Sequence, residues 1–241
     1  MNIYKYAAPT LFYPLAGKMI PWFAIPATIL FAAGLFVGFF IAPTDFQQGD
    51  AYRIMFIHVP AAWMGMFLYV LMEIYAGIGW AFNARLSSMM ASAIAITGAS
   101  FTAISLVTGA FWGKPTWGTW WVWDARMTST LILLFLYAGF ISLQAAIDDP
   151  RRADRAGAVL ALVGVINVPI IYFSVQWWNT LHQGATIRIL GKPSIAPPML
   201  AAMLIMLAAC WLYSIAIVLA RLRVIILERE QNAARFAEVN A

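Results

Sequence analysis

Two histidines and a tryptophan-rich segment are the parts of this sequence best suited to chemistry. His58, in FIHVPAAW, and His182, in WWNTLHQG, are the only histidines in the chain. Between them, residues 112–126 read WGKPTWGTWWVWDAR and hold five of the eleven tryptophans. Imidazole is a common metal ligand, and indole offers a wide, rigid apolar face. If the fold brings these segments together, they predict a metal held beside a flat apolar surface.

Three arginines near these segments extend the pattern. Arg126 closes the aromatic segment, Arg53 precedes His58 by five positions, and Arg188 follows His182 by six. Arginine pairs with carboxylates through a bidentate fork. Haem would use every one of these features, since it has a planar macrocycle, an iron with two axial positions and two propionates. The sequence has no cluster of Cys, His, Asp and Glu at zinc-like spacing that competes with this hypothesis.

The composition predicts an integral membrane protein. The 241 residues are 63% hydrophobic and 10% charged, whereas a soluble domain carries about 25% charged residues. The net charge of +5 is too small to suggest a nucleic-acid partner. The one cysteine, Cys210, lies in an apolar run, and the chain has no CxxC or CxxCH motif. Metal or redox chemistry must therefore use other ligands.

Six apolar stretches are long enough to cross a hydrocarbon core, which takes about 20 helical residues. They lie near Trp22–Ala42, Val59–Phe82, Met89–Phe111, Met127–Ile147, Ala156–Val175 and Pro198–Ala220. Their hydrophobicity is continuous, whereas barrel strands alternate. We therefore predict an all-α integral membrane protein, a six-helix bundle formed by residues 1–220, followed by a charged helical tail over 221–241. The first stretch is interpreted as a retained span rather than a signal peptide.

The distribution of lysine and arginine predicts the orientation. Ten of these residues lie on the side of the N-terminal tail, the second and fourth loops and the C-terminal tail, and five lie on the opposite side. The excess places both termini in the cytoplasm. His58, His182 and the aromatic loop between the third and fourth helices then all lie on the outer side.

The aromatic loop also permits a local prediction. Gly113, Pro115 and Gly118 interrupt regular structure. If a helix resumes after Gly118, four residues follow i, i+3, i+4, i+7 spacing and share one face: Trp117, Trp120, Trp121 and Asp124. They would form an aromatic shelf. Asp124 would either fix the loop by accepting backbone or indole hydrogen bonds, which we favour, or help to dock a partner.

Each of these features also has an ordinary interpretation. Tryptophan is enriched at membrane interfaces, and a single interfacial histidine is more often a satisfied polar residue than a ligand. From the residues alone, a porphyrin site and a belt of interfacial aromatics in a protein with another task both remain open. Glu73, inside the second span, is a functional candidate by default, but a hydrogen bond to a neighbouring helix explains it more simply. Asn167 and Pro169 predict a kink in the fifth span.

Residues 112–126 closely resemble the tryptophan-rich WWD signature of a family of haem-handling proteins in cytochrome c biogenesis. The chain length, the six spans and one histidine on each side of the motif resemble the branch formed by the haem exporter C proteins (CcmC) of the bacterial cytochrome c maturation system. The resemblance covers nearly the whole chain. Larger members of the family have more spans and additional histidines, which this chain lacks.

The resemblance implies a protein that holds haem b at the periplasmic face of the inner membrane. His58 and His182 would be the axial iron ligands, and the motif residues would lie beside the macrocycle: Trp112, Trp117, Gly118, Trp120, Trp121, Trp123 and Asp124. The roles assigned to Arg53, Arg126 and Arg188, in contrast, come from their charge and their side of the membrane.

The resemblance also implies partners. The chain would be the haem-binding component of an ABC-type export or release complex with an ATPase (CcmA), a permease-like protein (CcmB) and a small single-span protein (CcmD). It would pass haem to a periplasmic haem chaperone (CcmE). It would not itself be an enzyme, because the sequence lacks the GxxxxGK[ST] phosphate loop and ATP hydrolysis would belong to a partner.

Two other functions provide alternatives. A b-type cytochrome electron carrier or a component of a quinone oxidoreductase would more naturally bury its paired histidines within spans, whereas here one histidine lies in a loop. A small-solute permease would need a polar pathway, and the spans offer little beyond Glu73 and Asn167.

Overall fold

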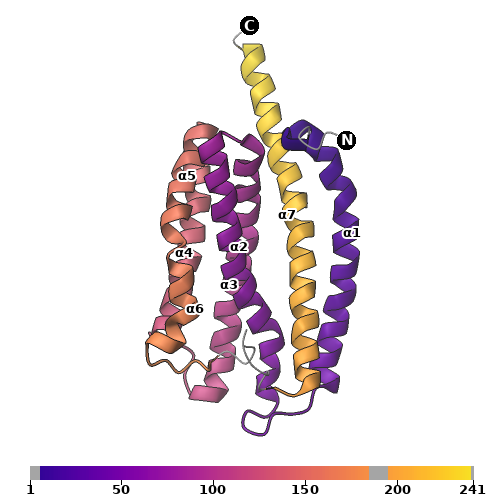
Figure 1. Cartoon of the computed structure of the whole chain (residues 1–241), viewed down its shortest axis with the longest axis vertical. Helices are drawn as coiled ribbons and strands as arrows, with labels where there is room; N and C mark the ends of the chain where they lie inside the picture. Colours follow the sequence, from indigo (N-terminus) through magenta and orange to yellow (C-terminus); the bar gives the residue numbers. More distant parts are fainter. Residues whose placement is uncertain (1–5, 185–194, 240–241) are drawn as a thin grey trace.

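The described part of the chain is almost entirely helical. The computed structural model describes residues 6–184 and 195–239, with side chains as far as Gln231. Its α-helices are α1 (Pro9–Phe36), α2 (Met55–Phe82), α3 (Arg85–Trp117), α4 (Ala125–Ala146), α5 (Pro150–Gly164), α6 (Asn167–Trp177) and α7 (Pro197–Val239). A π-helical turn, η2 (Val37–Ile41), ends α1, and a 3-10 turn, η3 (Asp50–Ile54), leads into α2. In Figure 1, α2 to α6 gather on one side of the molecule and α1 pairs with α7 on the other.

The prediction of six membrane-spanning helices is confirmed. Within the described residues, six helical segments are long and apolar enough to cross a membrane: Pro9–Ile41, Asp50–Phe82, Arg85–Trp117, Ala125–Ala146, Pro150–Trp177 and Pro197–Gln231. The first begins well before the predicted Trp22, and its helix continues through Pro14, Pro21 and Pro26. The chain is therefore a multi-pass membrane protein.

The fifth span is broken, as Asn167 and Pro169 predicted. Helix α5 ends at Gly164 and α6 begins at Asn167, with a turn between them. Proline has no N–H to donate, and Val168 N–H donates instead to the Val165 carbonyl at 3.0 Å. The Asn167 amide donates to the Ser129 carbonyl of α4 at 2.8 Å. The break therefore gives α6 its own attachment to α4.

Helix α7 continues past the predicted boundary at residues 220 and 221. It runs without interruption from Pro197 to Val239, so the charged tail is helical as predicted but is a continuation of the sixth span. In Figure 1 its last turns project beyond the rest of the bundle.

Small residues bring α2 and α3 close together at the centre of the bundle. A side chain at Gly65 would collide with Thr102 of α3, and the Gly65 carbonyl accepts a hydrogen bond of 2.8 Å from the buried Tyr137 hydroxyl of α4. Met64, Leu68 and other buried residues of α2 fill the core between these helices. This packing fixes the register of α2 against α3.

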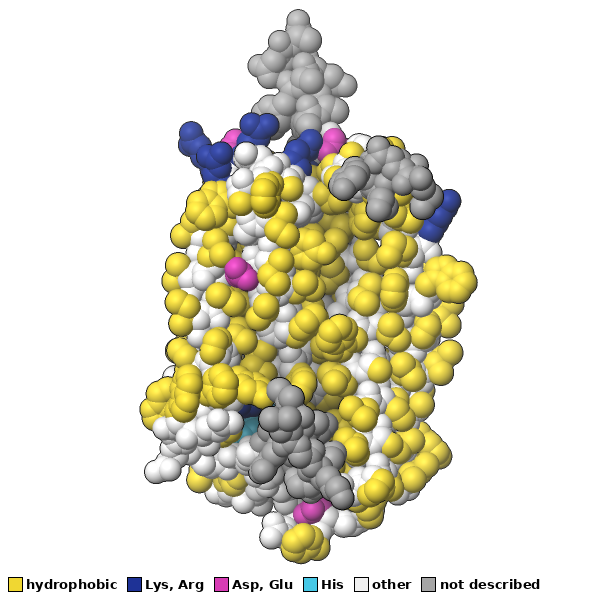
Figure 2. All heavy atoms as spheres, in the orientation of Figure 1, with side chains coloured by type: hydrophobic (Ala, Val, Ile, Leu, Met, Phe, Trp, Pro, Cys, Tyr) yellow, Lys and Arg dark blue, Asp and Glu magenta, His cyan; other side chains and the backbone are white. Residues whose placement is uncertain are grey.

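The two ends of the bundle differ in charge. Figure 2 shows an apolar flank, with lysine and arginine gathered at the end that holds both termini and a histidine visible toward the other end. We call the first the basic end, which carries these described residues: Lys18, Arg85, Arg151, Arg152, Arg155, Arg221, Arg223 and Arg229. We call the other, where α3 ends and α4 begins, the tryptophan end. That the basic end faces the cytoplasm stays a prediction.

Candidate functional site

His58 lies at the tryptophan end with its side chain turned into the bundle. It sits in the first turn of α2, and only 7% of it is exposed. Its Nδ1 lies 3.0 Å from the Ser105 carbonyl of α3 and 3.2 Å from Thr108 Oγ1. A carbonyl can only accept, so Nδ1 carries the proton and Nε2 keeps its lone pair. A histidine that binds a metal typically has its second ring nitrogen held in this way.

A glycine of α3 makes room for the His58 ring. A Cβ added at Gly109 would lie 3.0 Å from His58 Cε1 and 3.4 Å from its Nδ1. Together Ser105, Thr108 and Gly109 form one face of α3 on which the imidazole rests. We call these three residues the imidazole bed. The sequence interpretation missed it, because small and hydroxyl residues in an apolar span carry no distinctive signal; only their i, i+3, i+4 spacing was available.

His182 lies in the segment after α6 and close to His58. The two ring centroids are 6.1 Å apart, with the ring planes at 34°. Nδ1 of His182 lies 2.9 Å from the Gln183 carbonyl, so its Nε2 also keeps a lone pair. Burial, and then the positive charge of Arg126, hold the pKa of His182 below its ordinary value. The ring is therefore neutral at pH 7, the form that binds a metal.

The ring separation suits one metal ion between the two imidazoles. A metal–nitrogen bond is about 2.0 Å, and a ring nitrogen lies roughly 1.1 Å from its ring centre, so two opposed ligands place their centroids about 6 Å apart. The observed 6.1 Å agrees with this value. The described residues offer no group of three or more His, Cys, Asp and Glu side chains that could hold a metal ion. A site with only two imidazoles suits a metal ion that is already bound by other ligands within a larger molecule.

Each histidine has a tryptophan beside it. The ring of Trp112 meets that of His58 edge-on, with centroids 5.6 Å apart, and its Nε1–H donates to Gln48 Oε1 at 2.7 Å. The ring of Trp117 lies 6.2 Å from that of His182. Both indoles come from the last turns of α3. The predicted approach of aromatic residues to the two histidines is thus present at these two positions.

A cavity joins these side chains. His58, His182, Trp112, Trp117 and Arg126 all line it. Its volume is about 50 Å³. Pockets that enclose a ligand commonly hold about 300–1,000 Å³. A large planar ligand would therefore lie mostly in the mouth.

Arg126 is the arginine that reaches this cavity. Its guanidinium donates from Nη1 to the Ile171 carbonyl of α6 at 2.8 Å, and it lines the cavity with both histidines. A guanidinium has five N–H donors, so donors remain for an anion.

Arg53 is not brought to the cavity. Its Nη1 donates to the carbonyls of Gly38 and Ala42, at 2.6 and 3.0 Å, and its Nε donates to Asp50 Oδ1 at 2.9 Å. Arg53 thus fastens the end of the first span to the start of the second. Arg188, the third predicted arginine, lies outside the described residues.

The predicted helical shelf is wrong. Helix α3 ends at Trp117, Gly118 turns the chain with a φ of 78°, and α4 begins only at Ala125. Two side chains explain why no helix forms between them. Thr119 Oγ1 donates to the Trp121 carbonyl at 3.0 Å, a local bond that competes with helix formation. Asp124 Oδ1 accepts from Met127 N–H at 2.8 Å, which makes it the N-cap of α4; this is the loop-fixing role predicted for it.

The tryptophans after Gly118 therefore point in different directions. Trp120 packs edge-on against Phe111, with centroids 5.5 Å apart, and is 51% exposed. Trp123 is 74% exposed and meets the ring of Trp121 edge-on at 5.3 Å. Trp121 Nε1 is buried and has no hydrogen-bond partner among the described residues. Of the five indoles in the aromatic segment, two line the cavity, two face outward and that of Trp121 is partly buried.

Comparison with known proteins connects this site to a family. Residues 2–237 match the family described as "Heme exporter protein C" (CcmC). The chain belongs to the haem exporter protein C family. It is 46% identical over 231 residues to Heme exporter protein C of Escherichia coli (strain K12), covering 96% of this chain and 93% of that protein.

Other members of the haem exporter protein C family are equally similar. The protein of that name from Bradyrhizobium diazoefficiens is 44% identical over 240 residues, covering 100% of this chain and 91% of its own length. The one from Haemophilus influenzae is 48% identical over 198 residues, covering 82% and 80% respectively. The similarity extends over all six spans, so the predicted family resemblance is confirmed.

Proposed function

We propose that the chain binds haem b at its tryptophan end, between His58 and His182, and releases it to an acceptor during the maturation of c-type cytochromes. Membership of the haem exporter protein C family supports a role in haem export for this process. One observation carries the specific site: two imidazoles, each with its Nδ1 held by a carbonyl, line one cavity with their ring centroids 6.1 Å apart.

Haem in this proposal is cargo, and its iron brings four equatorial nitrogen ligands of its own. Only two axial ligands are then required of the protein, which is the number that the cavity offers. The bonds from His58 Nδ1 and His182 Nδ1 to carbonyls orient both rings and make both Nε2 atoms better donors to the iron.

The shape of the cavity favours a haem that is held but not enclosed. Because the cavity volume is only about 50 Å³, the bundle would surround the axial ligands while much of the macrocycle stays in the mouth. Trp112 and Trp117 would contact the ring there, and Arg126 would pair with a propionate through its remaining donors. A partly exposed ring suits a protein that must release its ligand.

The outward-facing indoles Trp120 and Trp123 are proposed to meet the acceptor. They are exposed and follow the cavity-lining Trp117 by three and six residues, and aromatic side chains are common anchors at protein interfaces. The acceptor would be the periplasmic haem chaperone (CcmE), which places the tryptophan end on the periplasmic face of the inner membrane. The ATPase, the permease-like protein and the single-span protein (CcmA, CcmB and CcmD) would complete the export complex.

The ligand assignment is tested by haem binding to the purified full chain. His58→Ala or His182→Ala should each remove one axial ligand, change the absorption spectrum and lower haem retention, and the double variant should retain little. Gln183→Ala is the matched control, because it alters the neighbouring side chain but keeps the carbonyl that orients His182. A double histidine variant that retains haem with an unchanged spectrum would overturn the assignment.

The handover role is tested by comparing the two pairs of tryptophans. Replacing Trp120 and Trp123 with leucine should reduce haem arriving on the chaperone more than it reduces haem retained by the chain. Replacing Trp112 and Trp117 with leucine should instead reduce mainly the haem retained by the chain. If the outward-facing pair loses retained haem in step with transfer, those indoles belong to the binding pocket and the handover role fails.

A further inference from the structure

A second cavity lies at the basic end, between α3, α4 and α7. It has a volume of about 380 Å³, within the range of about 300–1,000 Å³ common for ligand pockets. Its apolar wall includes Ile96 of α3, Ile141 of α4 and Ile225 of α7. Ser92, on its wall, is seventeen residues from Gly109 along α3, which is roughly 25 Å at 1.5 Å per residue. This cavity is therefore separate from the site that holds the histidines.

The cavity is lined by two opposite charges that do not pair. Arg221 and Glu228, both on α7, line it, but neither takes part in an ion pair within the described residues. Arg221 Nε is buried and has no hydrogen-bond partner there. A buried guanidinium nitrogen without a hydrogen-bond partner destabilises the fold. Arg221 is therefore available to bind an anion in this cavity.

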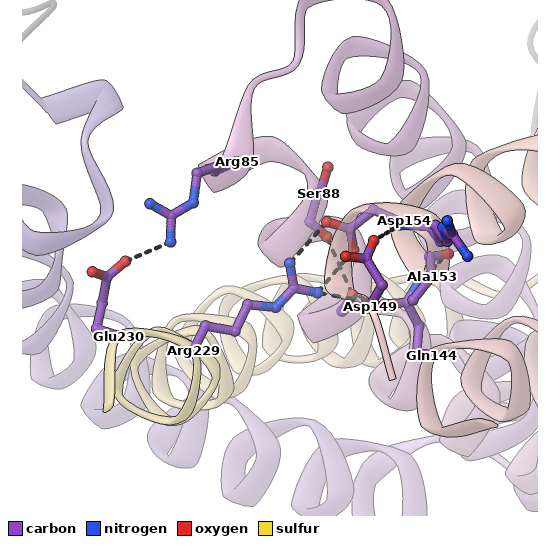
Figure 3. A network of polar contacts seen from close by, with 10 residues as sticks. Arg85, Ser88, Gln144, Asp149, Ala153, Asp154, Arg229 and Glu230 are labelled. Atoms are coloured by element: carbon purple, nitrogen blue, oxygen red, sulfur yellow. Dashed lines mark hydrogen bonds and ion pairs between the residues drawn. The ribbon is translucent and has the colours of Figure 1, made fainter. Parts of the chain in front are cut away.

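Two other arginines at the basic end, unlike Arg221, are held in ion pairs. Arg229 makes a two-pronged ion pair with Asp154, with both nitrogen–oxygen distances at 2.8 Å. Arg85 pairs with Glu230 at 2.9 Å. Figure 3 shows both pairs, with Arg229 reaching from α7 toward Asp154 of α5. The cavity lies beside this network but its own charges stand outside it.

The uncharged polar groups of the cavity already make hydrogen bonds within the protein. The Gln144 amide donates to the Ala153 carbonyl at 3.0 Å and accepts from Arg229 at 3.4 Å, as Figure 3 shows. Ser92 Oγ donates to the Ser88 carbonyl at 3.2 Å. A ligand would therefore find its strongest polar contacts at Arg221 and Glu228.

The order of the two charges along α7 indicates the kind of ligand. Seven residues separate them, which is about two helical turns or 10.5 Å, and Arg221 is the deeper in the bundle. A flexible arginine side chain can extend its charge toward the membrane surface, which would shorten the separation between the two charged groups. A fitting ligand would carry an anionic group on the bundle side, a cationic group on the outer side and an apolar chain.

We propose that this cavity binds phosphatidylethanolamine from the membrane leaflet at the basic end. The phosphate pairs with Arg221, the ammonium with Glu228, and the glycerol and upper acyl chain lie against Ile96, Ile141 and Ile225. The ammonium offers N–H donors for short charge-assisted bonds, which the trimethylammonium of phosphatidylcholine lacks. Phosphatidylglycerol has no positive charge to meet Glu228. The cavity should therefore select phosphatidylethanolamine over both.

The test uses the full chain in nanodiscs that contain equal parts of phosphatidylethanolamine, phosphatidylcholine and phosphatidylglycerol. After the protein is released from the nanodiscs, native mass spectrometry identifies and counts the lipids that stay bound to it. The first retained lipid should be predominantly phosphatidylethanolamine. Arg221→Gln should lower lipid retention by about tenfold or more, the loss expected for a charge-assisted hydrogen bond. Glu228→Gln should keep retention but remove the preference for phosphatidylethanolamine over phosphatidylglycerol.

Arg223→Gln is the matched control, since its guanidinium lies 4.3 Å from the Tyr13 ring and does not line the cavity. It should leave both retention and selectivity unchanged. Glu228 is exposed, so its substitution keeps the test decisive even if Arg221→Gln folds poorly. Equal retention of the three lipids by the wild type, or unchanged selectivity in Glu228→Gln, would overturn the proposal.

Discussion

Gly109→Ala should damage the proposed haem site without destabilising the fold. A Cβ at this position would lie 3.0 Å from His58 Cε1, whereas carbon atoms in contact prefer about 3.5–4.0 Å. The imidazole must therefore move off α3 by about 0.5 Å or more. That shift stretches the 3.0 Å contact between Nδ1 and the Ser105 carbonyl toward 3.5 Å, at the limit of a hydrogen bond.

The expected magnitudes separate binding from stability. Losing the hydrogen bond costs about 0.5–1.5 kcal/mol, while replacing glycine with alanine inside a helix gains about 1 kcal/mol. The free energy of unfolding should therefore change by less than about 1 kcal/mol. Disturbing a group that orients a metal ligand typically costs 10- to 100-fold in affinity, so haem affinity should fall by at least about tenfold.

The assay pairs haem titration, followed by absorbance, with thermal unfolding of the same detergent-solubilised samples. Gly77→Ala is the control, because a Cβ there would meet only Leu162 Cδ2 at 3.8 Å, an ordinary contact. Wild-type haem affinity in Gly109→Ala would refute the role of the imidazole bed. A loss of affinity that accompanied a large drop in melting temperature would show a folding defect instead.

Three further predictions concern single side chains. Arg126→Ala should weaken haem binding by about tenfold or more, and Arg126→Lys should restore it only partly because a point charge lacks the planar fork; absorbance titration measures both. Asp124→Ala should lower stability by about 1 kcal/mol and speed hydrogen exchange at the start of α4, while Asn keeps most of the cap. Arg229→Gln should destabilise by about 1–3 kcal/mol in thermal unfolding, between the values for exposed and buried pairs, since both partners are largely covered at 18% and 16% exposure. Arg85→Gln, in a more exposed pair, should cost less than about 1 kcal/mol.

The long-range arrangement could be predicted from the sequence because hydrocarbon imposes a simple rule. Every backbone polar group in the membrane must be satisfied within its own helix, so each long apolar run becomes a span. Counting spans then places His58, His182 and residues 112–126 at the same end. The first span was predicted to start near Trp22, whereas α1 begins at Pro9 and continues through three prolines.

Local geometry within the site was harder to predict. Helical spacing placed Trp117, Trp120 and Trp121 on one face, but it ignored the competing bonds of Thr119 and the cap made by Asp124. Arg53 was judged by its distance in sequence from His58, yet neighbouring backbone carbonyls satisfy it. The role of Gly109 could not be predicted for a different reason, since it arises only when a second helix packs against this position.

The break between α5 and α6 has a mechanical consequence for the proposed iron ligands. From Val165 to Trp177 the chain rises roughly 18 Å at 1.5 Å per residue, and His182 follows five residues later. A tilt of about 10° at the break would thus move the end of α6 by roughly 3 Å. That displacement exceeds a metal–nitrogen bond length of about 2.0 Å, so it would separate an imidazole from a bound metal. Two hydrogen bonds oppose that swing, from Asn167 to Ser129 and from Arg126 to Ile171. The same guanidinium that is proposed to hold a propionate therefore also holds α6, the helix that leads to the second proposed ligand. A displacement of α6 would change the contact with the propionate, and the reverse would also hold.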